Sequence, residues 1–135
     1  MPNPNTNVNV GVGNVDIVLA IQNLKVASTS SVTISSGSTV STQFNLDGNL
    51  LCGFVIPSGY DGGNITIQAS DADGGTFYDI YDSNGTAVIV TIGGDNRIVN
   101  LVGNSLQAVA SAPYIKLKSA STVGANRTIK VLAKG

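Results

Sequence analysis

The chain contains no histidine, no tryptophan and a single cysteine among its 135 residues. Histidine is the commonest general base and transition-metal ligand, so its absence excludes Ser-His-Asp triads and histidine zinc sites. Without tryptophan the chain also lacks the best sugar platform for a glycosidase. One cysteine cannot form an internal disulfide, so stability must come from packing. These absences indicate a protein that is not an enzyme and needs no cofactor.

Charge is also scarce, with 11% charged residues and a formal net charge of -1, whereas an average soluble domain has roughly 25%. Without a basic excess, nucleic acid is not an expected partner. Residues 15–21 form the longest apolar stretch, which is interrupted by Asp16 and too short to span a bilayer, so no membrane partner is expected. Because charge keeps proteins apart, so neutral a surface predicts a homo-oligomer, a trimer rather than a dimer.

The length suits one hydrophobic core, and the pattern divides the chain into an N-terminal arm, residues 1–27, and a β-domain, residues 28–135. In the arm, Val8, Val10 and Val12 alternate with Asn and Gly, which predicts a strand. A lone strand near a chain end has to pair with the edge of a sheet, in its own domain or a neighbour's. Residues 15–26 fit a short helix and a second strand equally well.

After residue 28, short alternating runs are separated by Gly, Asn, Asp and Ser turns. This pattern predicts an all-β fold, an antiparallel β-sandwich or jelly roll of about eight or nine strands. Val40, Phe44 and Leu46 are expected on one face of a strand. Residues 65–69 and 76–81 are expected to form a hairpin, the later strands to continue as a meander, and no helix is expected after Val26.

The segment 50–56 is apolar on both faces, with Leu51 and Val55 opposing four other side chains. Such a strand is either central and covered on both sides, or its outer face meets the arm or another subunit. Cys52 is expected to be a buried structural thiol. The candidate interface residues are Val8, Val10, Val12, Leu50, Cys52, Phe54 and Tyr60.

The acidic residues Asp71, Asp73 and Asp79 are the candidates for a metal site, because the first two have the opening spacing of a calcium loop. The rest of an EF-hand is missing, since Gly75 occupies the fifth position and no helices flank the loop. Asp and Gly also suit a tight hairpin turn, which we favour. Aromatic residues near turns are expected at the core and rim of the sandwich, at an interface or, less favoured, on a sugar platform; they are Tyr60, Phe77, Tyr78 and Tyr81.

Between about residues 40 and 133, a strand ending in Pro, a strand ending in Ser, a D-G-G-T turn and a late K-L-x-S strand follow one another. The segments are residues 54–57 (FVIP), 64–70 (NITIQAS), 73–76 (DGGT), 78–82 (YDIYD), 114–119 (YIKLKS) and 126–129 (NRTI). In this order they resemble small β-sandwich structural proteins of tailed bacteriophages. The arm lies outside the resemblance.

The resemblance implies a virion structural protein with no catalytic residues to carry over. Together with the neutral surface and the arm, it favours a decoration or cement protein on the capsid surface, which binds and stabilises the lattice of the major capsid protein. The alternative is a module associated with the tail or a head fibre. It would bind host surface glycans through the turns near Tyr60 and residues 71–81.

Overall fold

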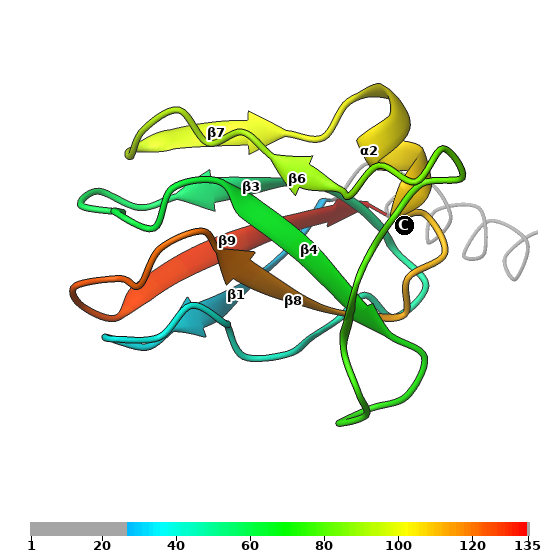
Figure 1. The fold of residues 1–135 in the computed structure, drawn as a ribbon, viewed down its shortest axis with the longest axis horizontal. Coiled ribbons are helices and arrows are strands. Elements are labelled where there is room, and N and C mark those ends of the chain that lie inside the picture. Colours follow the sequence, from blue (N-terminus) through cyan, green and yellow to red (C-terminus); the bar gives the residue numbers. More distant parts are fainter. Residues whose placement is uncertain (1–26, 135) are drawn as a thin grey trace, which may run out of the picture.

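Two antiparallel β-sheets face each other in the computed structural model, which describes residues 27–134 (Figure 1). The first sheet contains, in spatial order, β1 (Ala27–Ile34), β9 (Arg127–Lys134), β3 (Leu50–Ile56) and β7 (Arg97–Asn100). The second contains β2 (Phe44–Asn45), β8 (Tyr114–Ser119), β4 (Ile65–Ser70) and β5 (Tyr78–Asp79), and β6 (Ile89–Val90) also pairs with β4. The predicted all-β sandwich of about eight or nine strands is confirmed.

The strand order is that of a jelly roll. Only β4, β5 and β6 follow one another within one sheet, and every other connection carries the chain from one sheet to the other. The expected continuous meander is therefore wrong. Early and late strands alternate in each sheet, and β1 pairs with β9 along its whole length, from Ala27 opposite Lys134 to Ile34 opposite Arg127. This order is the double Greek key of jelly rolls.

Alternating side chains from both sheets fill the space between them. In β8, Ile115 and Leu117 are fully buried, whereas Lys116 and Lys118 lie on the outer face. Full burial of such aliphatic side chains contributes about 1.5–3 kcal/mol each. Other large, fully buried side chains are Ile34, Leu46, Leu51, Phe54, Ile56, Ile65, Ile67 and Ile129.

The predicted hairpin of β4 and β5 is confirmed. Gln68 lies opposite Asp79 and Ala69 opposite Tyr78. The amide N–H of Gly75 donates a hydrogen bond to the carbonyl oxygen of Ala72 at 3.0 Å, which closes a tight turn between the two strands.

The expected alternation in β3 breaks at Cys52. Leu51 pairs with Ala133 and Gly53 with Leu132, so Cys52 is an extra residue at a β-bulge. A bulge shifts the later residues by one position, which reverses the faces they occupy. Leu51, Phe54 and Ile56 are therefore all buried in the core, whereas Leu50, Cys52 and Val55 are half-buried. Cys52 is not the fully buried thiol that was expected. Of the two alternatives for this segment, the sheet order fits a central strand, since β3 lies between β9 and β7.

The expected strand around residues 40–46 is regular only in β2. Val40 is 37% exposed although it was expected beside Phe44 and Leu46, which are buried. Ser41 is buried in its place, because its hydroxyl accepts a hydrogen bond from the amide N–H of Leu117 at 2.9 Å. A specific polar partner thus overrides the apolar alternation.

One short helix, α2 (Gly103–Ala108), was not expected from the sequence. It is anchored by half-buried Leu106 and Ala108, and by the fully buried Val109 that follows it. A helix of six residues spans fewer than two turns, too short for a helical period to be recognised. Among the described residues, no helix has the length and apolar character needed to cross a membrane.

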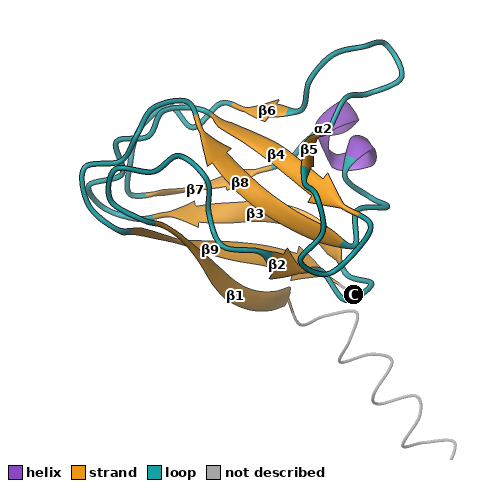
Figure 2. Ribbon diagram, turned by 60° about the horizontal axis from the view of Figure 1, so that its bottom comes forward, coloured by secondary structure: helices purple, strands orange, loops and turns teal. Residues whose placement is uncertain are grey.

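The connections between strands gather at two opposite ends of the sandwich (Figures 1 and 2). The loop end carries the β1–β2, β3–β4, β6–β7 and β8–β9 connections. The helix end carries α2 and both ends of the described chain, since Ala27 pairs with Lys134. The candidate arm residues Val8, Val10 and Val12, and the segment 15–26, lie outside the described residues.

Candidate functional site

Two of the acidic residues considered for a metal site, Asp73 and Asp79, interact with different polar partners. The carboxylate Oδ1 of Asp73 accepts a hydrogen bond from Gln43 Nε2 at 2.7 Å. On the outer face of the second sheet, Asp79 Oδ1 accepts one from Gln68 Nε2 at 2.9 Å, and its other oxygen lies 3.9 Å from Lys118 Nζ. These contacts hold the two carboxylates in different polar pairs.

Asp71 does not join them. Within residues 27–134, no group of three or more His, Cys, Asp or Glu side chains is placed to hold a metal ion. Residues 71–75 instead form the turn that joins β4 to β5, in which Gly74 has a φ of 66° that favours glycine. The turn interpretation of this acidic segment is the one that the geometry supports.

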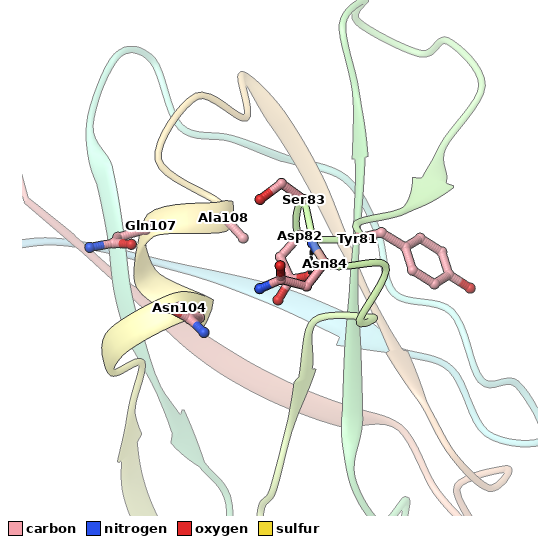
Figure 3. A pocket seen from close by; sticks show the side chains of 7 residues that line it. All are labelled: Tyr81, Asp82, Ser83, Asn84, Asn104, Gln107 and Ala108. Carbon is pink, nitrogen blue, oxygen red and sulfur yellow. Dashed lines mark hydrogen bonds between the residues drawn. The ribbon is translucent and has the colours of Figure 1, made fainter.

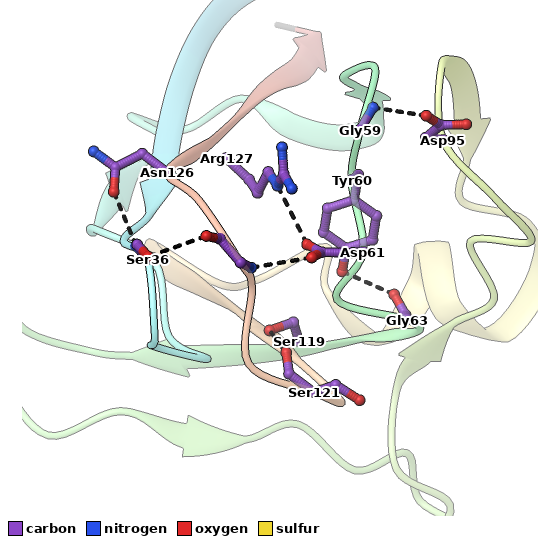
Figure 4. Close-up of polar contacts among 11 residues, drawn as sticks. Ser36, Gly59, Tyr60, Asp61, Gly63, Asp95, Ser119, Ser121, Asn126 and Arg127 are labelled. Atoms are coloured by element: carbon purple, nitrogen blue, oxygen red, sulfur yellow. Dashed lines mark hydrogen bonds and ion pairs between the residues drawn. The ribbon is translucent and has the colours of Figure 1, made fainter.

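Asp61, in the β3–β4 loop, connects this loop to the β8–β9 loop at the loop end (Figure 4). Its Oδ1 accepts a hydrogen bond from Arg127 Nε at 3.2 Å, and its Oδ2 accepts one from the amide N–H of Gly124 at 3.0 Å. The hydrogen bond from Arg127, and then that from Gly124, holds the pKa of this carboxyl below its usual value. The ionised carboxylate therefore stabilises the β3–β4 loop against the β8–β9 loop.

Further polar contacts tie the remaining loops of this end together. The amide N–H of Ser36 donates to Asn126 Oδ1 at 2.9 Å, and the amide N–H of Gly59 donates to Asp95 Oδ2 at 2.6 Å. All four loops are thus cross-linked by hydrogen bonds (Figure 4). Because these donors and acceptors are paired with one another, we interpret the hydrogen bonds of the loop end as structural contacts that hold the four loops together.

The candidate interface residues separate into buried and outward-facing groups. Phe54 is 0% exposed and Tyr60 is 8% exposed, so both side chains belong to the core and present almost no surface to a partner. Leu50 and Cys52 are half-buried on β3. Of this set, only Leu50 and Cys52 are available at the surface of the described domain.

Large apolar side chains that the sequence did not single out are exposed where both sheets end. Ile89 on β6 is 51% exposed, Ile98 on β7 is 60% exposed, and Val102, just after β7, is 73% exposed. These three residues define the β6–β7 flank, in which Ile98 lies on the outer face of the first sheet and Ile89 on that of the second. On the opposite side, where β1 and β2 end the sheets, Val40 is the only exposed large apolar side chain among the described residues of that side. Exposed aliphatic side chains are therefore more frequent beside β6 and β7 than beside β1 and β2.

Two clefts lie beside α2 at the helix end. The first, of about 300 Å³, separates α2 from the turn at residues 82–84, whose Asp82 Oδ1 accepts hydrogen bonds from the amides of Asn84 and Thr86. Figure 3 shows Asn104 and Gln107 on α2 at one side of this cleft, and the Tyr81 ring pointing away from the helix.

The second cleft, of about 380 Å³, lies between the β4–β5 hairpin and the segment after α2. We call it the Tyr78 cleft, because Tyr78, which is 68% exposed, lines it. The other lining residues on which its character depends are Asp71, Ala108, Ser111, Ala112 and Pro113. It combines an aromatic ring with small apolar and hydroxyl side chains.

Comparison with known proteins gives no assignment. No protein-family model matches the chain, and no curated protein or solved structure shows significant similarity to it. Function must therefore be argued from the β6–β7 flank and the two clefts. Sequence reasoning singled out Tyr78 and Tyr81, but it missed the flank, because no local signal distinguishes an exposed Ile98 from a buried Val90.

Proposed function

We propose that the protein is a structural component of a tailed bacteriophage virion, which binds the capsid surface and stabilises the lattice of the major capsid protein. Two observations support this: the resemblance of residues 40–133 to small virion sandwich proteins, and the exposed β6–β7 flank. A protein that acts by attachment needs an apolar surface and no reaction centre. Jelly rolls occur in viral capsids and also in lectins, so the fold alone does not choose between these roles.

The β6–β7 flank is the observation on which attachment rests. Burying apolar surface contributes about 25 cal/mol per Å², and Ile89, Ile98 and Val102 each keep more than half of their surface exposed. Few charges would have to lose water at such a contact, because the chain has only 15 charged residues, 7 basic and 8 acidic. Modest contacts of this kind become strong attachment when linked copies bind a repeating lattice.

The free edge of β7 offers a second mode of attachment beside the flank. Among the described strands β7 pairs only with β3, so its other edge can accept a further strand. The alternating segment with Val8, Val10 and Val12, supplied by a neighbouring copy, has the pattern for such pairing. Strand addition provides main-chain hydrogen bonds in addition to side-chain contacts.

Attachment can be tested on capsids of the phage that encodes the chain, prepared without this protein. The Ile89→Ser/Val102→Ser variant is expected to bind about tenfold more weakly than the wild type, a loss of about 1.4 kcal/mol. Val40→Ser removes an exposed apolar residue from the opposite flank and should bind normally. Co-sedimentation gives the affinities, and cryo-electron microscopy gives the location. Absence of binding to the capsid contradicts the proposal, and a few copies at the tail favour the alternative.

A second candidate function, a tail or head-fibre module that binds host glycans, is favoured by a separate observation. The Tyr78 cleft offers an exposed aromatic ring beside polar groups, which is the composition of a small-ligand site. Such a module would be present in few copies per virion, whereas a decoration protein would cover the shell.

A further inference from the structure

We propose that the Tyr78 cleft binds an uncharged pyranose sugar, as a single ring or the end of a glycan. The site would be formed by the ring of Tyr78, the apolar floor around Ala108 and Ala112, and the polar groups of Asp71 and Ser111. The cleft shares no residue with the β6–β7 flank. Sugar binding is therefore independent of capsid attachment, and either can fail without the other.

The Tyr78 ring provides a stacking platform. Its backbone is fixed by pairing with Ala69 of β4, while its side chain remains 68% exposed at the cleft. Aromatic faces carry negative charge density, so they attract the weakly positive C–H groups of an apolar sugar face. In a monomer, a tyrosine as exposed as this does not contribute to the core, so its ring is available to a ligand.

The floor of the cleft is apolar and firmly supported. Ala69, Ile80, Ala108 and Ala112 are half-buried and pack against the hydrophobic core. Small side chains leave a shallow hollow rather than a ridge. The volume of about 380 Å³ is near the lower end of the roughly 300–1,000 Å³ that is usual for ligand pockets. One or two sugar rings match this size better than a folded partner does.

Two polar groups at the cleft are free to bind a ligand. Asp71 and Ser111 are exposed, and neither side chain makes a hydrogen bond to any described residue. The neighbouring Ser70 differs, because its hydroxyl donates to the carbonyl oxygen of Ala72 and accepts from the amide of the same residue. A carboxylate accepts hydrogen bonds from two sugar hydroxyls, and these charge-assisted bonds are the stronger kind.

The charge of the cleft selects among sugars. None of its lining residues is Lys or Arg, and Asp71 adds a negative charge. An anionic sugar such as a sialic acid or a uronic acid would be repelled and would find no cation to pair with. The ligand is therefore a neutral hexose or N-acetylhexosamine.

The test is a nuclear magnetic resonance titration of the full chain with galactose, glucose, mannose, N-acetylglucosamine and N-acetylneuraminic acid at millimolar concentrations. At least one neutral sugar should shift the amide signals of Tyr78, Ala108 and Ala112, and N-acetylneuraminic acid should not. The Tyr78→Ala variant should bind about tenfold more weakly, the size expected for losing one aromatic stacking contact.

Tyr81→Ala is the matched control, because Tyr81 is 60% exposed in the same region but does not line the Tyr78 cleft. Both tyrosines are exposed, so neither variant should impair folding. The inference is overturned if no neutral sugar binds, if both variants lose binding equally, or if the anionic sugar binds as well as the neutral ones. Capsid binding by Tyr78→Ala should be unchanged, which separates this inference from the proposed capsid role.

Discussion

Tyr60 is a core residue with one polar atom, and this combination makes the loop end sensitive to pH. Its hydroxyl donates a hydrogen bond to the carbonyl oxygen of Gly63 at 2.8 Å. Burial, assisted by the negative charge of Asp61, raises the pKa of Tyr60 from 10.0 to about 12. The folded state therefore holds the phenol proton more tightly than the unfolded state does, and the stability that this proton contributes is lost as the pH rises above 10 toward about 12.

Removing this hydroxyl should cost stability at neutral pH and change the alkaline unfolding profile. We expect Tyr60→Phe to lower the free energy of unfolding by about 1 kcal/mol at pH 7, the usual net value of one hydrogen bond. The advantage of the wild type should persist below pH 10 and be lost as the pH rises toward about 12. Urea unfolding from pH 7 to pH 12 measures this, with Tyr81→Phe as an exposed control. A difference that is constant over this range contradicts the prediction.

At the scale of single residues, the sequence predicted correctly those positions whose conformation depends on their neighbours along the chain. The Asp and Gly residues at 71–75 were expected to form a turn, and they do. For Tyr60, near a turn, the core or rim of the sandwich and an interface were both considered, and it is buried under its own loop. Gly62 makes this possible, since a Cβ there would lie 2.6 Å from the Tyr60 hydroxyl. The packing of Tyr60 against Gly62 depends on the conformation of the whole loop, which a local sequence pattern does not predict.

The contact between β3 and β7 depends on a residue without a side chain. A Cβ on Gly53 would lie 2.6 Å from the carbonyl oxygen of Val99 and 2.7 Å from Asn100 Oδ1. Gly53 does not have a positive φ, so alanine would be tolerated or stabilising there if the space were open. The nearest atom belongs to the backbone and cannot rotate away. The clash with the Val99 carbonyl oxygen therefore decides that alanine at position 53 destabilises the protein.

We expect Gly53→Ala to destabilise the protein by about 1–3 kcal/mol, the usual cost of overpacking. The loss should be concentrated at β7, including the hydrogen bond from the amide of Leu101 to the carbonyl oxygen of Cys52. Hydrogen exchange of the β7 amides, together with thermal unfolding, measures both effects. Cys52→Ala, next to it at the bulge and half-buried, should change little. Equal effects of the two substitutions would show that the close approach at Gly53 is unimportant.

At the scale of elements, the sequence predicted what adjacent residues determine. The β4–β5 hairpin and the alternation of β8 follow from turn residues and a period of two, and both are confirmed. The faces of β3 were assigned incorrectly, because the bulge at Cys52 exists only in relation to β9. The sheet order depends likewise on the pairing of β1 with β9, strands separated by most of the chain. Long-range pairing of this kind leaves no trace in a local pattern.

For the whole molecule, low charge and the distribution of apolar surface point to association. One row of residues crosses the outer face of the first sheet: Ile98 lies opposite Val55, Val55 opposite Lys130, and Lys130 opposite Ser31. The row is apolar toward β7 and polar toward β1. With a formal net charge of -1, copies of the chain repel one another little. A closed ring that buries Val55 and Ile98 would cover this apolar half and leave Ile89 and Val102 of the β6–β7 flank for the proposed capsid attachment.

We expect the free protein to sediment as a trimer, with little change between low and high salt because few charges take part. Val55→Glu should shift it toward monomer, since it places a charge within the apolar half of the row. Ser31→Glu is the matched control, because both substitutions put a carboxylate opposite Lys130 and both can pair with it. Sedimentation velocity at several concentrations measures the masses. A wild type that stays monomeric at high concentration, or a Ser31→Glu variant that dissociates equally, would show that this face does not associate. Trimers formed only on the capsid would then have to be sought in the particle itself.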